Sequence, residues 1–208
     1  FAKPQVSKRS IWETADAAVK LANANSSVGQ DGTINAFWQG AIAGDDQLRQ
    51  RVAFALSQIF VISMQDGAVG DNPRAVAAYL DMLGERGFGT HRELLQSVSL
   101  HPMMGAYLTS IRNQKADPRT GRVPDENFGR EVMQLMSIGL YQLNADGSRQ
   151  LAAGLPVDTY SPSDISGMSK VFTGWSWNCP DWPDNTCFFN GSANGSANPD
   201  RTFTAMQG

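Results

Sequence analysis

Residues 48–63, LRQRVAFALSQIFVIS, hold the longest apolar run of this 208-residue chain. Leu48, Val52 and Ile59 recur at the spacing of one helical face, and two aspartates precede the run, where acidic side chains complement the positive end of a helix dipole. Further apolar residues such as Phe54 widen this face until little polar surface remains, which is typical of a core helix. The run is shorter than the roughly 20 residues that a membrane-spanning helix needs. We therefore predict a buried helix at the centre of the fold.

Further helices are predicted from start and stop signals along the chain. Ser10 and Glu13 have the spacing of a capping box, and Thr90 and Ser161 precede two later helices as caps. A tight-turn signal at residues 146–147 predicts one short hairpin. The predicted helices cover residues 10–22, 33–44, 45–62, 73–83, 91–100, a short segment from 102, a segment from 125 and residues 161–171. The sequence therefore predicts a mainly α fold, a single helical-bundle-like domain over residues 1–177 with long irregular loops.

Residues 178–208 are predicted to form a separate loop segment rich in asparagine and glycine. Cys179 and Cys187 enclose a short loop within it, and a disulfide between them would order a segment with few other means of stabilisation. A disulfide implies an oxidising compartment. The alternative of two unpaired thiols in a cytosolic protein stays open, because one pair does not establish a disulfide framework.

The composition excludes several classes of partner. The chain is 41% hydrophobic and 18% charged, which is ordinary for a globular protein, and its net charge is −3. An acidic chain without a lysine or arginine cluster offers no electrostatic surface for nucleic acid. We therefore expect no nucleic acid partner, and no transmembrane segment in this chain.

A second stretch, residues 124–140, PDENFGREVMQLMSIGL, places acidic residues at the start of an apolar helix. Asp125 is predicted to cap this helix. The helical spacing of four apolar residues predicts a core stripe, formed by Phe128, Val132, Leu135 and Met136. Gly129 is unfavourable inside a helix by about 1 kcal/mol relative to alanine, which indicates that another backbone or a substrate approaches closely there.

The opposite face of the same helix is polar and is the candidate functional site. Its members, at helical spacing, are Asn127, Arg130, Glu131 and Gln134. Glu131 could act as an acid, a base or a metal carboxylate, with Arg130 setting its pKa or binding an anion, and Asp164 is the candidate second carboxylate. The alternative is a buried polar network that ties the helix to neighbouring loops, because structural and catalytic ion pairs look alike in a sequence.

Two other residue types have candidate roles. The only histidines are His91 and His101, and neither belongs to a nucleophile elbow or a zinc motif, so we interpret both as capping or packing residues. Trp175 and Trp177 could stack on a sugar or anchor a loop to the core, and we favour anchoring. Trp175 is retained as a candidate ligand-binding residue.

Four blocks of the chain resemble, in their order, the bacterial family catalogued as domain of unknown function 1800. These blocks are LRQRVAFALSQIFVIS, HPMM, PDENFGREVMQLMSIGLYQLNADG and YSPSDISGMSKVFTGWSW. Members of that family are typically longer, often exported and without an established activity. The resemblance implies that this chain is part of a longer protein and that it is periplasmic, on the cell surface or secreted.

The resemblance also assigns positions. The Asn-x-x-Arg-Glu core of the family falls on Asn127, Arg130 and Glu131, its acidic helix start on Asp164, and its Thr-Gly-Trp on residues 173–175. Many relatives carry histidine where this chain has methionine, at position 136, and another histidine in the helix that holds residues 55–60. If those histidines are ligands or bases elsewhere, this chain lacks that chemistry.

Two functions are compatible with these patterns. The first is an extracytoplasmic helical protein that acts as a binding, surface or assembly module, with a protein partner or with itself. The second is a secreted hydrolase that uses Glu131 and Asp164, with or without Arg130, on a carbohydrate or an ester. No cofactor is predicted, although a divalent metal is compatible with the second function. The absence of a standard catalytic spacing favours the first.

Overall fold

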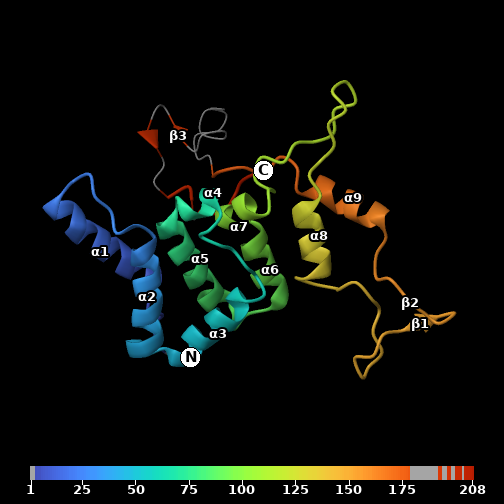
Figure 1. Cartoon of the computed structure of the whole chain (residues 1–208), viewed down its shortest axis with the longest axis horizontal. Helices are drawn as coiled ribbons and strands as arrows, with labels where there is room; N and C mark the ends of the chain where they lie inside the picture. Colours follow the sequence, from blue (N-terminus) through green and yellow to red (C-terminus); the bar gives the residue numbers. More distant parts are fainter. Residues whose placement is uncertain (1–2, 179–191, 194–195, 198–199, 203) are drawn as a thin grey trace. The chain divides into compact units, whose positions relative to one another are not determined.

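Helices dominate the structure, as predicted. The computed structural model describes residues 3–178, 192–193, 196–197, 200–202 and 204–208, and Figure 1 shows its elements. The helices are α1 Lys8–Ala22, α2 Gly29–Ala43, α3 Gln47–Ser57, α4 Gly67–Gly70, α5 Pro73–Arg86, α6 His91–Ser99, α7 Pro102–Tyr107, α8 Asn127–Gln134 and α9 Pro162–Val171. Two short antiparallel pairs accompany them: β1 Leu151–Ala152 with β2 Leu155–Pro156, and β3 Ser192–Ala193 with β4 Ser196–Ala197. Over these described ranges, no helix combines the length and the apolar character that crossing a bilayer requires.

The chain divides into two compact units. The first unit comprises Phe1–Tyr107 and Ser176–Gln207, and the second unit comprises Leu108–Trp175 together with Gly208. The sequence patterns alone place no boundary near residue 108, because the loop there resembles other loops of the chain. Most of the segment from residue 178 onward lies outside the described residues, and this includes Cys179 and Cys187.

Helix α5 is the central helix of the first unit. It contacts α1, α2, α3, α4, α6 and α7 (Figure 1), and its buried side chains include Val76, Tyr79 and Leu83. Tyr79 donates its hydroxyl to the carbonyl of Phe60 at 2.8 Å inside this core. The helix therefore combines apolar packing with a satisfied polar group.

The prediction that residues 48–63 form the central buried helix is wrong. Helix α3 does form there, but it buries only Gln50 and Ala53. Leu48 is 60% exposed and Phe54 is 49% exposed. Helical spacing identifies an apolar face, whereas the burial of that face depends on which other elements cover it. Phe37 of α2 lies against one side of the Phe54 ring, with centroids 5.9 Å apart, and leaves about half of the Phe54 side chain exposed.

Asp81 of α5 caps the first turn of α1 from outside that helix. Its carboxylate accepts hydrogen bonds from the Ser7 hydroxyl at 2.7 Å, the Lys8 amide at 2.9 Å and the Arg9 amide at 3.0 Å. These donors belong to the helix terminus, where amides lack partners within the helix. The predicted capping box at Ser10 is wrong, since α1 begins at Lys8 and the Ser7 hydroxyl accepts from the Ser10 amide.

A buried lysine extends this polar contact to α3. Lys8 is 2% exposed, and its Nζ lies 2.5 Å from Gln50 Oε1 and 4.0 Å from an oxygen of Asp81. Desolvation lowers the pKa of Lys8, while the charges of Asp81 and Asp46 oppose that change. The Gln50 amide group donates to both oxygens of Asp46. This network therefore joins the N-terminal segment to α3 and α5 through directional bonds.

Helices α8 and α9 pack against each other in the second unit. A Cβ atom added to Gly129 would lie 3.4 Å from the backbone nitrogen of Ser169 and 3.6 Å from Met168 Cβ. Phe128 and Phe172 form an edge-to-face ring pair beside this point, with centroids 4.6 Å apart. The predicted close approach of another backbone to Gly129 is therefore confirmed.

Substitutions at Gly129 should show how closely α8 and α9 approach. Gly129→Ala should raise the free energy of unfolding by about 0.5–1 kcal/mol, because the methyl group makes ordinary contacts and alanine favours the helix. Gly129→Val should lower it, because the branched carbons would meet the α9 backbone. Urea denaturation followed by circular dichroism measures both changes. If the valine variant were as stable as the alanine variant, the contact between the helices would be looser than described.

Candidate functional site

The polar face of α8 is at the surface of the second unit. Asn127, Arg130 and Gln134 are exposed, and Glu131 is half-buried. The Asn127 amide group donates to the Leu108 carbonyl at 3.4 Å, a long bond that still links the helix start to the preceding segment. The interpretation of this face as a buried polar network is therefore wrong, and its side chains are accessible to a ligand or a partner.

Arg130 pairs with Glu126 and not with Glu131. One Arg130 Nη lies 2.6 Å from a carboxylate oxygen of Glu126, four residues earlier in the chain, and both side chains are substantially exposed. Exposed pairs of this kind contribute at most about 1 kcal/mol to stability. Glu131 has no hydrogen bond or ion pair from its carboxylate to another described residue. Arg130 therefore makes no direct ion pair with Glu131, and its alternative role of binding an anion stays a prediction.

Asp164 forms a capping box at the start of α9. Its carboxylate accepts from the Ser161 amide at 2.8 Å and from the Ser161 hydroxyl at 2.7 Å. These two hydrogen bonds, the hydroxyl bond foremost, lower the pKa of Asp164. A carboxyl group with a lowered pKa is ionised at neutral pH, which suits a capping residue better than a general acid. The described part of the chain contains no group of three or more His, Cys, Asp or Glu side chains that could hold a metal ion.

Helix α8 ends earlier than predicted, and its core stripe differs from the prediction. Phe128, Val132 and Met136 are buried as predicted, but Leu135 is 60% exposed and Met133 is buried instead. The chain leaves α-helical geometry after Gln134, as the Met136 amide bonds the carbonyl five residues back. Leu135 still bonds the Glu131 carbonyl four residues back, so the end of the helix does not by itself explain the exposure of Leu135.

Asp125 contributes to the start of α8 one residue before the N-cap position, which Glu126 occupies. Its carboxylate accepts a hydrogen bond from the Asn127 amide at 2.8 Å. Asp125 therefore accepts an amide at the helix start, as predicted for a capping residue, but it stands one residue before the N-cap position. An acid used in this way supports the helix end and has one carboxylate oxygen already engaged.

The tryptophans and one histidine have mainly structural contacts. Trp175 donates its indole N–H to the Val171 carbonyl at 3.2 Å, at the end of α9. Trp177 packs against a buried cluster of the first unit that includes Val69 and Met103, so the anchoring interpretation is confirmed for Trp177. His101 accepts the Met103 amide on Nδ1 at 3.2 Å and packs edge-to-face on Tyr79, which confirms its capping and packing role.

Sequence reasoning missed a hollow in the second unit, close to the start of α8. It has a volume of about 590 Å³ and is lined by residues of the segments 109–114 and 122–125. Asn113, predicted to begin a surface loop, is instead buried and joins these two segments. Neither Glu131 nor Asp164 lines this hollow. The signal that could have suggested it is the group of basic residues between 112 and 122.

Comparison with known proteins shows the family. A family model described as "Protein of unknown function (DUF1800)" matches residues 3–206, which is nearly the whole chain. The chain belongs to the DUF1800 family. No curated protein matches it, and no solved structure matches it. The DUF1800 match confirms the resemblance of the four sequence blocks and assigns no activity to them.

The departure at Met136 has a structural explanation in this DUF1800 chain. Met136 is buried, and so it does not share the exposed polar face with Arg130 and Gln134. An unbranched thioether side chain fills irregular space in a core. The polar face of α8 therefore contains two amides, one carboxylate and one guanidinium, but no imidazole.

Proposed function

We propose that this DUF1800 chain acts as an extracytoplasmic binding or assembly module, and that the surface shared by α2 and α3 contacts an apolar protein partner. The observation that carries the proposal is the exposure of large apolar side chains on these two helices. Trp38 is 56% exposed and Ile42 is 77% exposed on α2. Contiguous exposed apolar surface of this kind marks interaction sites in folded proteins.

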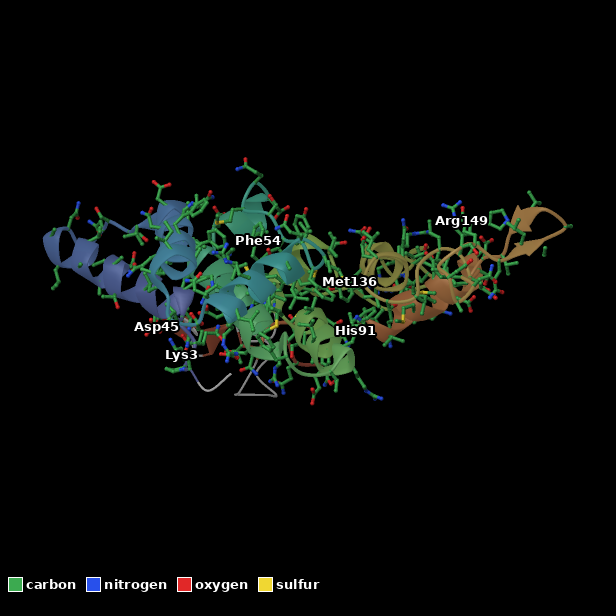
Figure 2. The ribbon with its side chains drawn as sticks, turned by 90° about the horizontal axis from the view of Figure 1, so that it is seen from below. Lys3, Asp45, Phe54, His91, Met136 and Arg149 are labelled. Carbon is green, nitrogen blue, oxygen red and sulfur yellow. The ribbon has the colours of Figure 1, made fainter. Side chains whose placement is uncertain are left out.

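Aromatic contacts make this surface continuous across the two helices. The ring of Phe37 lies 5.3 Å from that of Trp38 and 5.9 Å from that of Phe54 on α3. Ile34 and Ile42 lie one turn of α2 before and after Trp38, on the same face. Figure 2 labels Phe54 among the side chains of α3. We refer to Ile34, Phe37, Trp38, Ile42 and Phe54 as the α2–α3 aromatic surface.

A partner that covers this surface would gain most from the two exposed aromatic residues. Tryptophan and other aromatic side chains dominate the energetics of interfaces, because they bury a large area with few rotatable bonds. The surface lies on regular helices, so its side chains need little reordering on binding. These properties suit a module that joins other proteins or other copies of itself.

A second copy of the chain is the partner that can be tested directly. We expect concentration-dependent association in sedimentation velocity, weakened by about 2 kcal/mol or more in the Trp38→Glu, Phe54→Glu double variant. The matched control is the Leu151→Glu, Leu155→Glu double variant, which adds the same two charges at similarly exposed apolar positions in the second unit. Association that the control weakens equally, or a wild-type chain that stays monomeric, would contradict self-assembly through this surface.

The alternative of a secreted hydrolase has less support. Asp164 is engaged in the cap of α9, and Arg130 is paired with Glu126, so neither is arranged around the Glu131 carboxylate. Glu131 and Asp164 remain the residues to substitute in any test of hydrolysis, because they are the two carboxylates that the motif supplies. No metal site among the described residues adds to this alternative.

The extracytoplasmic part of the proposal is supported by the family resemblance and by the spacing of Cys179 and Cys187. Cell fractionation tests the location. Alkylation of free thiols before and after reduction, followed by mass spectrometry, tests the pairing of the two cysteines. A cytoplasmic protein with two alkylated thiols would contradict both expectations.

A further inference from the structure

We propose that the hollow between residues 109–114 and 122–125 binds a small ligand that carries an oxyanion, a carboxylate or a phosphate group, through Arg112 and Arg122. The hollow has a volume of about 590 Å³ and is wide open to solvent. Both arginines line it. A guanidinium group presents parallel N–H donors that match the two oxygens of a carboxylate or phosphate.

A buried asparagine fixes the two walls of the hollow relative to each other. Asn113 Oδ1 accepts from the Asp125 amide at 2.9 Å, and Asn113 Nδ2 donates to the Asp125 carbonyl at 3.1 Å. The Asn113 carbonyl accepts from the Gly174 amide at 2.9 Å. This clamp spans twelve residues of the chain, so the segments that carry the arginines are held in place before a ligand arrives.

A short hairpin positions Arg122 in the second wall. Asp117 and Arg122 form an antiparallel bridge with backbone bonds of 3.0 and 3.2 Å. The Nε of Arg122 donates to the Lys115 carbonyl at 3.1 Å. Because Nε is the donor used, this bond orients the guanidinium plane and leaves its Nη donors outside the Lys115 contact.

The first wall has an unusual backbone. Thr109 and Arg112 both have φ near +61°, and both line the hollow. Such left-handed conformations are uncommon for residues other than glycine and persist where the surroundings enforce them, often at ligand sites. Between them, Ser110 is buried, and its hydroxyl has no hydrogen-bond partner among the described residues. The backbone at Arg112 is held in this conformation by the bond from its amide to the Trp175 carbonyl at 2.7 Å.

The local charge favours an anion. Residues 109–125 contain four basic and two acidic side chains, a net charge of +2 in a chain whose net charge is −3. Both acids are engaged: Asp125 accepts from the Asn127 amide, and Asp117 lies 3.8 Å from Arg119. The charged residues that line the hollow itself are Arg112, Arg122 and Asp125, so its lining carries one more positive than negative charge. A concave site with net positive charge attracts anions.

Isothermal titration with inorganic phosphate and, separately, with succinate tests the proposal in chloride buffer. We expect saturable binding of one probe to one site, and the probe that binds identifies the oxyanion. Arg122→Gln should weaken this binding at least tenfold. Arg122→Lys should weaken it less, because lysine keeps the positive charge but lacks the two parallel N–H donors of the guanidinium group.

The matched control is Arg149→Gln. Arg149 lies over the ring of Tyr141 in the same unit, 4.5 Å from its centroid, and does not line the hollow. This variant removes the same charge and should keep the wild-type affinity. The proposal is overturned if neither probe shows saturable binding, or if Arg149→Gln weakens binding as much as Arg122→Gln. Circular dichroism of each variant distinguishes a lost site from a lost fold.

Discussion

Asp81→Ala should lower the free energy of unfolding by about 3–5 kcal/mol, the range measured when one partner of a buried charged contact is removed. The Asp81 carboxylate accepts three hydrogen bonds at the start of α1 and lies close to the buried ammonium of Lys8. Its loss would leave two helix amides without their acceptor and would remove the negative charge 4.0 Å from the buried Lys8 ammonium, which would keep its bond to Gln50. Urea denaturation followed by circular dichroism at neutral pH measures the change.

Two variants distinguish this cap from a general effect of removing an aspartate. Asp81→Asn keeps one acceptor oxygen, so its free energy of unfolding should lie between those of the wild type and the alanine variant. Asp71→Ala removes an exposed aspartate of the same unit and should change stability by no more than about 0.5 kcal/mol. If Asp81→Ala were as mild as Asp71→Ala, the contact between α5 and α1 would contribute little to stability.

The chain should lose stability steadily as the pH falls from about 6.5 toward 3. Burial lowers the pKa of His101 from its ordinary value of 6.5 to about 3. In this window the unfolded chain binds a proton at His101 that the folded chain excludes, so the free energy of unfolding falls by up to about 1.4 kcal/mol per pH unit. The stability that this lowered pKa of His101 provides is fully present above pH 6.5 and is lost as the pH approaches 3.

His101→Gln should flatten this dependence between pH 5 and 7, where few carboxyl groups titrate. Glutamine can still accept the Met103 amide, and the slope is informative even if the variant is less stable overall. The control is His91→Gln, which removes the other histidine of the chain, an exposed one. Chemical denaturation over a series of pH values gives the slopes. An unchanged slope in His101→Gln would show that another group causes the acid sensitivity.

The sequence predicts local features of the fold well and the burial of helices poorly. Pro73, Thr90 and Ser161 each mark a helix start that the structure confirms, because capping depends on residues within one turn. The choice of central helix is wrong, because α5 contains Arg74 and Asp81 and has no apolar run as long as residues 52–62. Those polar side chains find partners in other helices, which no local pattern shows.

For the candidate site as well, the sequence predicts local grouping but not the contacts between distant segments. The grouping of Asn127, Arg130, Glu131 and Gln134 on one helix face follows from spacing and is confirmed by the bounds of α8. The partner of Arg130 was also readable, since Glu126 lies four residues before it. The hollow beside Asn113 could not be predicted from the sequence. It depends on contacts between residues twelve positions apart and on left-handed backbone at Thr109 and Arg112.

The segments at which the second unit begins and ends lie close together in space, although they are far apart in the sequence. Within that unit, the Arg112 amide donates to the Trp175 carbonyl at 2.7 Å. Within the first unit, Tyr107 and Trp177 pack against the same buried cluster. Residues 108–175 are thus a cassette whose removal would leave two ends that a short linker can join.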